Sequence, residues 1–159
     1  MKLLSLFISC YLISISTALY SAENSRWGGA VVKHVEYKPQ KVVYDVKLKT
    51  LSAMNGVLDR ASYLSRITGA DLFDGSIVLV LHGAEIVFFA RKNYVQYKTL
   101  VDRAQSLVQG ETLKIKMCKL AAQGKGFEPN DIHGFIEMVP MGDAEIIRLQ
   151  NEEKHAYMQ

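Results

Sequence analysis

The sequence predicts a single α/β domain in which an open parallel sheet carries helices on both faces. Short segments rich in β-branched residues alternate with segments whose apolar residues recur every three or four positions. This alternation is typical of parallel strands joined by right-handed crossovers. The run Ser76–Leu81 is apolar after its first residue, as expected of a central strand covered on both sides. The 159 residues are 49% hydrophobic and 22% charged, which is enough apolar material for one core.

Residues 1–22 differ from the rest of the chain and are predicted to form a secretory signal peptide. A lysine near the start precedes an almost wholly apolar run over residues 3–15. Cleavage is expected after Ala18, with Ala22 as the other option. Because the apolar run is short for a membrane span, an uncleaved anchor is the minor alternative, and no span is expected after cleavage.

The mature protein is therefore expected to be periplasmic or secreted. Residues 23–40 are polar and contain glycine, which predicts an irregular lead-in. The remaining residues, 41–159, are expected to form the α/β domain.

The domain is predicted to begin with a strand and a helix. Lys41–Val46 is rich in β-branched residues and predicts a strand. Thr50 or Ser52 is expected to cap an amphipathic helix that ends near Gly69. A loop over residues 70–75 then leads to the central strand.

The middle of the domain is expected to hold more helix and one further strand. Residues 84–92 are mostly apolar and predict a short helix, and a helical stripe follows until Gly110. Residues 112–117 predict a strand that ends at Cys118, with a helical turn behind it reaching about Gln123.

The last predicted elements are a strand over residues 135–139, a helix over residues 144–153 and a short strand over residues 156–158. Asp143 is expected to cap the helix.

Several functional classes find little support in the sequence. A net charge of +3 without a basic block or stripe argues against nucleic-acid binding. Dinucleotide, phosphate-loop and serine-hydrolase motifs are absent from the sequence. His82, Cys118 and His133 are the residues that offer metal ligands, but their spacing matches no compact metal motif. No cofactor and no metal are therefore expected.

Cys118 is the strongest candidate for chemistry. Cleavage of the signal peptide would remove Cys10, so Cys118 would be the only cysteine of the mature protein. At the end of a strand and the start of a helix, its sulfur would meet unpaired backbone N–H groups. Lys116 and Lys119 flank it and would favour the thiolate, giving a nucleophile. The equally weighted alternative is a small, buried and inert side chain.

His82 and residues 140–143 also follow predicted strands, at the sheet edge where parallel α/β folds bind ligands. His82 precedes Gly83, which would let the backbone turn or approach a ligand closely, and is a candidate proton donor or acceptor beside the thiol. The alternative is a histidine hydrogen-bonded to the backbone at a strand end. His34 and His155 are expected to face solvent.

The order and spacing of several segments carry a family resemblance. These are residues 42–46 (VVYDV), 77–83 (IVLVLHG), 117–118 (MC), 139–150 (VPMGDAEIIRLQ) and 156–158 (AYM). From about Lys41 to Met158 the chain resembles the DsrE/DsrF-like family of small sulfur-carrier proteins, and it is most similar to the exported bacterial members.

The resemblance implies a three-layer α/β/α domain with a mainly parallel five-stranded sheet and assembly into homotrimers or homohexamers. It also implies that Cys118 occupies the position of a cysteine that carries sulfur as a persulfide between proteins. The chain departs from the family after this cysteine, because many members have Ala-Asn-Thr where it has Lys119-Leu120-Ala121.

Two functions of different classes follow from these observations. The first is a sulfur carrier or sulfurtransferase that works with donor and acceptor proteins: Cys118 accepts sulfane sulfur, Lys119 and the helix end stabilise the anion, and His82 assists proton transfer. The second is a non-catalytic, oligomeric binding module of the cell envelope. Its cysteine would be packed inside, and a cleft at the strand ends would hold a small molecule or a metal.

Overall fold

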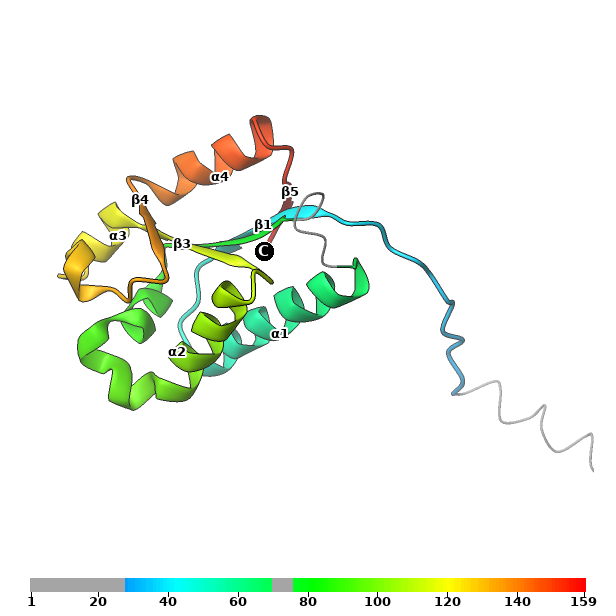
Figure 1. Cartoon of the computed structure of the whole chain (residues 1–159), viewed down its shortest axis with the longest axis horizontal. Coiled ribbons are helices and arrows are strands. Elements are labelled where there is room, and N and C mark those ends of the chain that lie inside the picture. Colours follow the sequence, from blue (N-terminus) through cyan, green and yellow to red (C-terminus); the bar gives the residue numbers. More distant parts are fainter. Residues whose placement is uncertain (1–27, 70–75) are drawn as a thin grey trace, which may run out of the picture. The chain divides into compact units, whose positions relative to one another are not determined.

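The computed structural model describes residues 28–69 and 76–159, which contain a five-stranded sheet in the order β4-β3-β2-β1-β5 (Figure 1). Every neighbouring pair of strands is parallel, so the predicted α/β class is confirmed and the sheet is parallel throughout. Residues 28–40 form no helix or strand. The predicted signal peptide and the loop over residues 70–75 lie outside the described residues.

Among the described residues, no helix has both the length and the apolar character needed to cross a membrane.

The strands agree closely with the sequence-based expectations. They are β1 (Lys41–Val46), β2 (Ser76–Leu81), β3 (Lys114–Cys118), β4 (Glu137–Val139) and β5 (Ala156–Met158). Strand β3 begins later than predicted because Thr112 takes part in the turn that caps the preceding helix, where its backbone N–H donates to the Leu107 carbonyl at 3.0 Å. Glu111 takes the left-handed conformation there, with φ of 56°, as in a Schellman motif. Strand β4 also begins late, because a turn joins the Ile136 N–H to the His133 carbonyl at 3.1 Å.

The helices are α1 (Leu51–Ile67), α2 (Tyr94–Gln109), α3 (Lys119–Gln123) and α4 (Gly142–Asn151), with 3-10 turns η2 (Ala84–Phe89), η3 (Arg91–Asn93) and η4 (Pro129–Asp131). Thr50 caps α1, since its hydroxyl accepts the Ala53 N–H at 3.2 Å. The short helix predicted for residues 84–92 is instead two 3-10 turns. The predicted cap of α4 was wrong: the helix begins earlier, and Asp143 lies in its first turn.

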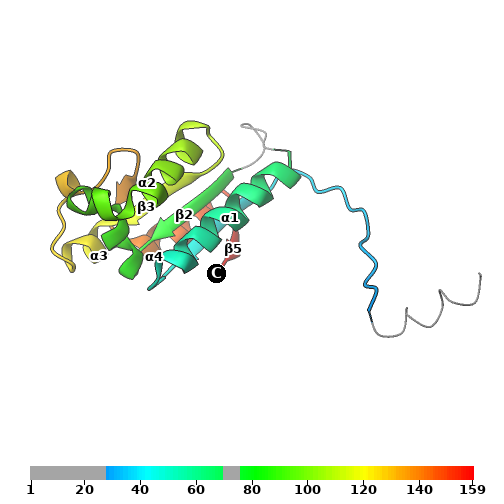
Figure 2. The ribbon, with the colours of Figure 1, turned by 90° about the horizontal axis from the view of Figure 1, so that it is seen from below.

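Helices cover both faces of the sheet. Figures 1 and 2 show α1 and α2 on one face and α4 on the opposite face. Side chains alternate along each strand, so every strand contributes to both sides. The larger core lies on the side of α1 and α2 and includes Tyr44, Leu79 and Met117. The α4 side holds a smaller apolar cluster of Val43, Val78, Val80, Ile146 and Leu149.

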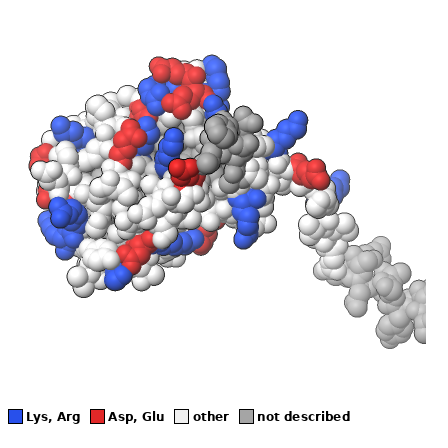
Figure 3. All heavy atoms as spheres, in the orientation of Figure 1, with Lys and Arg blue, Asp and Glu red and all other residues white. Residues whose placement is uncertain are grey.

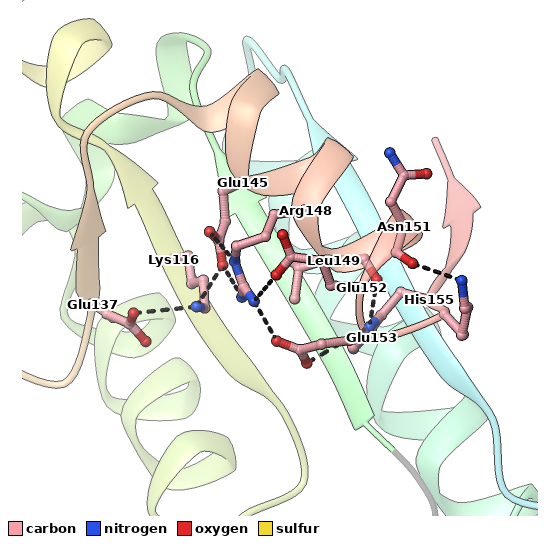
Figure 4. A network of polar contacts seen from close by, with 10 residues as sticks. Lys116, Glu137, Glu145, Arg148, Leu149, Asn151, Glu152, Glu153 and His155 are labelled. Carbon is pink, nitrogen blue, oxygen red and sulfur yellow. Dashed lines mark hydrogen bonds and ion pairs between the residues drawn. The ribbon is translucent and has the colours of Figure 1, made fainter.

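Charged residues complete the contact between α4 and the sheet (Figure 4). The Lys116 ammonium on β3 donates to Glu145 at 2.7 Å and to Glu137 at 3.1 Å. Arg148 donates to Glu145 at 2.8 and 2.9 Å and to Glu153 at 2.7 Å. The Arg148 hydrogen bonds, together with those from Lys116, outweigh burial and lower the pKa of Glu145 from 4.5 to about 2. This network fixes the position of α4 over β3.

Replacing Glu145 by Gln should lower the free energy of unfolding by about 1–3 kcal/mol at pH 7, because Lys116 would keep a largely buried charge with one partner fewer. The folded-state pKa of Glu145 is depressed, so its carboxylate contributes stability above pH 4.5 and loses that contribution as the pH falls towards 2. The difference from the wild type should therefore shrink at pH 3.

Urea unfolding at both pH values measures this difference. Glu152→Gln is the matched control, since the Glu152 side chain is 68% exposed and lies 3.6 Å from Arg148; its effect should stay below about 0.5 kcal/mol. An equal loss of stability at pH 7 and pH 3 in Glu145→Gln would contradict the role given to this carboxylate.

Candidate functional site

Cys118 is the last residue of β3 and the cap residue of α3. Its Sγ accepts a hydrogen bond from the Ala121 N–H at 3.4 Å, so the predicted meeting of the thiol with a helix start is observed. Such a bond is stronger when the sulfur is negatively charged. The residue is only 5% exposed, as the alternative of a packed cysteine also expects.

The two lysines beside the cysteine in sequence have different environments. Lys116 is engaged by Glu145 and Glu137, so its charge is already neutralised locally. Lys119 is the exposed first residue of α3, and it forms no ion pair within the part of the chain that the structure describes. Of the pair, Lys119 is the lysine whose charge is available to an incoming anion.

His82 stands beside Cys118 because of the strand register. Leu81, the last residue of β2, pairs with Met117 on β3. The residues that follow this pair in the two chain segments are His82 and Cys118. The backbone N–H of His82 donates to the Val46 carbonyl at 3.2 Å, which continues the hydrogen-bond ladder between β1 and β2 by one residue. Neighbouring parallel strands lie about 4.8 Å apart, and the two side chains leave the sheet on the same face.

Gly142, the first residue of α4, lies against both side chains. A Cβ on Gly142 would be 3.2 Å from the Cys118 Cβ and 3.2 Å from the His82 Cγ. The expected convergence at the strand ends therefore includes the loop after β4. That loop is tied to α3 by the Leu120 N–H, which donates to the Pro140 carbonyl at 3.4 Å.

The His82 ring lies between two carboxylates. Its Nε2 forms a very short contact with Asp45 Oδ1, and the two side chains are 8% and 7% exposed. Its Nδ1 is 3.8 Å from Oδ1 of Asp143, whose side chain is 55% exposed. The polar partners of the ring within the described residues are thus carboxylates, in contrast to the backbone partner that was the alternative for this histidine.

Asp45 is held by donors from three directions. Besides His82, the Tyr157 hydroxyl of β5 donates to Oδ2 at 2.7 Å and the Lys47 ammonium donates to the same oxygen at 3.3 Å. Burial alone would raise the pKa of Asp45, but the hydrogen bonds from Tyr157, His82 and Lys47 outweigh it and lower the pKa below its usual value. Asp45 is therefore an ionised acceptor.

Sequence reasoning did not assign a role to Asp45, Tyr157 or Gly142. A usable signal existed for Asp45, because it is the one acidic residue of β1 and lies one residue before the carboxyl end of that strand. Gly142 lies within the expected strand-end segment 140–143, but nothing in the sequence singles it out there; Tyr157 carries no comparable signal, since its role depends on a strand far away in sequence.

Glu85 holds the loops that follow β1 and β2. Its carboxylate is fully buried and accepts the Leu48 N–H at 2.6 Å and the Gly83 N–H at 2.7 Å. Gly83 is required there, because a Cβ would lie 2.5 Å from Glu85 Oε2 and 2.7 Å from the Lys47 Cα. The absence of a side chain at Gly83 thus allows the loop after β1 to approach closely; the expected approach to a ligand stays a prediction.

The other histidines lie elsewhere. His133 packs against Tyr94 and Phe135, with ring centroids 5.5 and 5.9 Å away. Within residues 28–69 and 76–159, no three His, Cys, Asp or Glu side chains are arranged to hold a metal ion. The expectation that His155 faces solvent was wrong: its side chain is fully buried in the turn after α4, and Nδ1 lies 3.2 Å from the Leu149 carbonyl. His34 is exposed, as expected.

Charges of both signs intermingle on the face of the molecule seen in Figure 3, including the surface over α4.

No protein-family model and no curated protein matches the chain. Among solved structures it is similar to the protein of unknown function MTH1491 from Methanobacterium thermoautotrophicum, with a TM-score of 0.60 and 20% sequence identity. The match covers 75% of this chain and 97% of that one. At this identity the likeness establishes a shared fold and carries no function.

Gly142→Ala should destabilise the protein by about 1–2 kcal/mol, because the added methyl must displace Cys118 and His82 by a few tenths of an ångström in a packed site. Gly56→Ala is the matched control: Gly56 lies inside α1 with open space at its Cβ, and the change should stabilise by up to about 1 kcal/mol. Urea unfolding of both variants measures the contrast. A Gly142→Ala protein as stable as the wild type would contradict the close packing of these three residues.

Proposed function

We propose that this protein carries sulfane sulfur as a persulfide on Cys118. The observation that carries the proposal is the setting of the thiol: its sulfur accepts the Ala121 N–H at a strand end, and the His82 ring lies beside it across Gly142. The sequence resemblance to DsrE/DsrF-like sulfur carriers supports it, since Cys118 matches the position of their cysteine. The parallel five-stranded fold is compatible with that resemblance.

Loading is a simple exchange of sulfur. The Cys118 thiolate attacks the outer sulfur of a donor persulfide or polysulfide, a new S–S bond forms at Sγ, and the donor's S–S bond breaks. The donor leaves as a thiolate and takes up the proton that Cys118 lost, so no external oxidant or reductant is consumed. Delivery reverses the process, with the acceptor thiolate attacking the terminal sulfur.

The surroundings of the thiol suit this exchange. The Ala121 N–H stabilises negative charge on the sulfur, and the exposed Lys119 attracts an anionic donor. Leu120 and Met141 are 63% and 45% exposed beside the site and offer apolar surface to a donor or acceptor protein. We extend the proposal to a homo-oligomer of the periplasm or cell exterior that exchanges sulfur with such partners.

A second candidate function rests on the burial of Cys118. A residue that is 5% exposed, next to an Asp45–His82 pair already supplied with hydrogen-bond partners, also suits a non-covalent binding module of the cell envelope with an inert cysteine. The two candidates differ in whether the native thiol reacts.

Sulfur loading is tested by intact-protein mass spectrometry after exposure to polysulfide or thiosulfate. The wild type should gain the mass of one sulfur atom, the gain should disappear after treatment with dithiothreitol, and Cys118→Ser should show no gain. Absence of the gain in the wild type, or the same gain in Cys118→Ser, would refute the proposal.

Alkylation by iodoacetamide at pH 7 separates the two candidates. Sulfur carriage predicts that native Cys118 is labelled at a rate within about 10-fold of the urea-unfolded protein, since burial is compensated by activation of the thiol. Labelling that occurs only after unfolding would favour the binding module.

A further inference from the structure

We infer that Asp45 sets the tautomer of His82, so that Nδ1 of His82 is the atom that exchanges a proton with the sulfur bound at Cys118. This inference rests on the proposed sulfur chemistry and adds a positioning role for Asp45, Tyr157 and Asp143. None of the three lies near Cys118 in sequence. The fold places Asp45 and Asp143 beside the His82 ring, and it places Tyr157 on the other oxygen of Asp45.

The proton between Asp45 and His82 belongs to Nε2. Asp45 is ionised and can only accept, so the contact with Oδ1 requires a hydrogen on the ring nitrogen. Tyr157 and Lys47 donate to the other oxygen at 2.7 and 3.3 Å and hold the carboxylate in this orientation. A neutral imidazole protonated at Nε2 has a bare Nδ1, which is its only acceptor.

The bare Nδ1 lies on the side of the ring that faces α4. It is 3.8 Å from Asp143 Oδ1, and the neighbouring ring carbon Cγ is as close to the Gly142 Cβ position as the Cys118 Cβ is. A persulfide places its terminal sulfur about 2 Å beyond Sγ. The base and the reacting sulfur therefore occupy the same small region around the first turn of α4.

Asp143 stabilises the charged form of the ring. When Nδ1 accepts the Cys118 proton, the thiol becomes a thiolate and the ring becomes an imidazolium between two carboxylates. Because the Asp143 side chain is 55% exposed, solvent weakens its attraction, and the ring can release the proton to the departing thiolate. The proton taken from Cys118 is thus returned to the donor, and the exchange is balanced.

The tautomer is measured directly by long-range ¹H–¹⁵N correlation spectra of protein labelled at histidine, which separate bare from protonated ring nitrogens. His82→Gln assigns the signals. The wild type should show Nε2 protonated and Nδ1 bare. In Asp45→Asn, Tyr157 and Lys47 should keep the amide oxygen on their side, which turns the amide NH₂ towards Nε2 and moves the ring proton to Nδ1.

The rate of persulfide formation, followed by single-turnover mass spectrometry with polysulfide, tests the consequence. Asp45→Asn should slow it by about 100-fold, the low end of what a positioned base contributes. Tyr157→Phe removes one of the donors to Asp45 and should retain the wild-type tautomer, with a rate within about 3-fold of the wild type. Asp59→Asn, on the exposed side of α1 with a side chain 67% exposed, is the matched control and should change neither readout.

The outcomes test the role of Asp45 and the sulfur-carrier function separately. A wild-type ring with its proton on Nδ1, or an Asp45→Asn protein that keeps the wild-type tautomer and rate, overturns the role of Asp45 even if Cys118 loads sulfur. A wild type with the expected tautomer that takes up no sulfur overturns the sulfur-carrier function and with it the proton transfer. The wild-type spectrum decides the tautomer even if Asp45→Asn fails to fold.

Discussion

The parallel register of β1, β2 and β3 is the constraint on which the site depends. It places His82 and Cys118 in the same row of neighbouring strands, one residue beyond the pair Leu81 and Met117, and it directs both side chains towards α4. Asp45 lies on the next strand, diagonal to His82, because it pairs with Val80 two residues earlier. A shift of one residue in either pairing would send these side chains to the apolar face under α1 and α2 and leave buried charge without a partner.

The α4 face of the sheet has less apolar packing than the opposite face and more paired charges. Five apolar residues form its core, whereas the opposite face holds most of the hydrophobic core. Two groups of paired polar residues occupy the rest of this face. One is Lys116 with its two glutamates, and the other is Asp45 with His82, Tyr157 and Lys47. Such pairs cost desolvation, and their benefit is positional: they hold the first turn of α4, and with it Gly142 and Asp143, over the ends of β2 and β3.

Cys118 is buried, yet its sulfur has a polar partner. A cysteine that is 5% exposed is shielded from oxidants in solution, and the Ala121 N–H supplies its sulfur with a polar contact. Leu120 and Met141, which follow Cys118 and Pro140 in the chain, are exposed apolar residues. Glu85 stabilises this geometry by holding the loops after β1 and β2 together.

The sequence by itself determined the fold class, the bounds of β1 and β2, the helical start behind Cys118 and the strand-end positions of Cys118 and His82, because these follow from local periodicity and turn residues. Local patterns also misplaced some features. Asp143 is of a residue type that caps helices but lies inside the first turn of α4. His155 is polar, yet the turn between α4 and β5 buries its side chain. Only the tertiary structure decided that Asp45 and Tyr157 belong to the site and that Gly142 packs against His82 and Cys118, since these contacts join residues far apart in sequence; the hydrogen bond from Tyr157 to Asp45 spans 112 residues. Such contacts depend on strand order and helix placement, and no local pattern in a single chain encodes them.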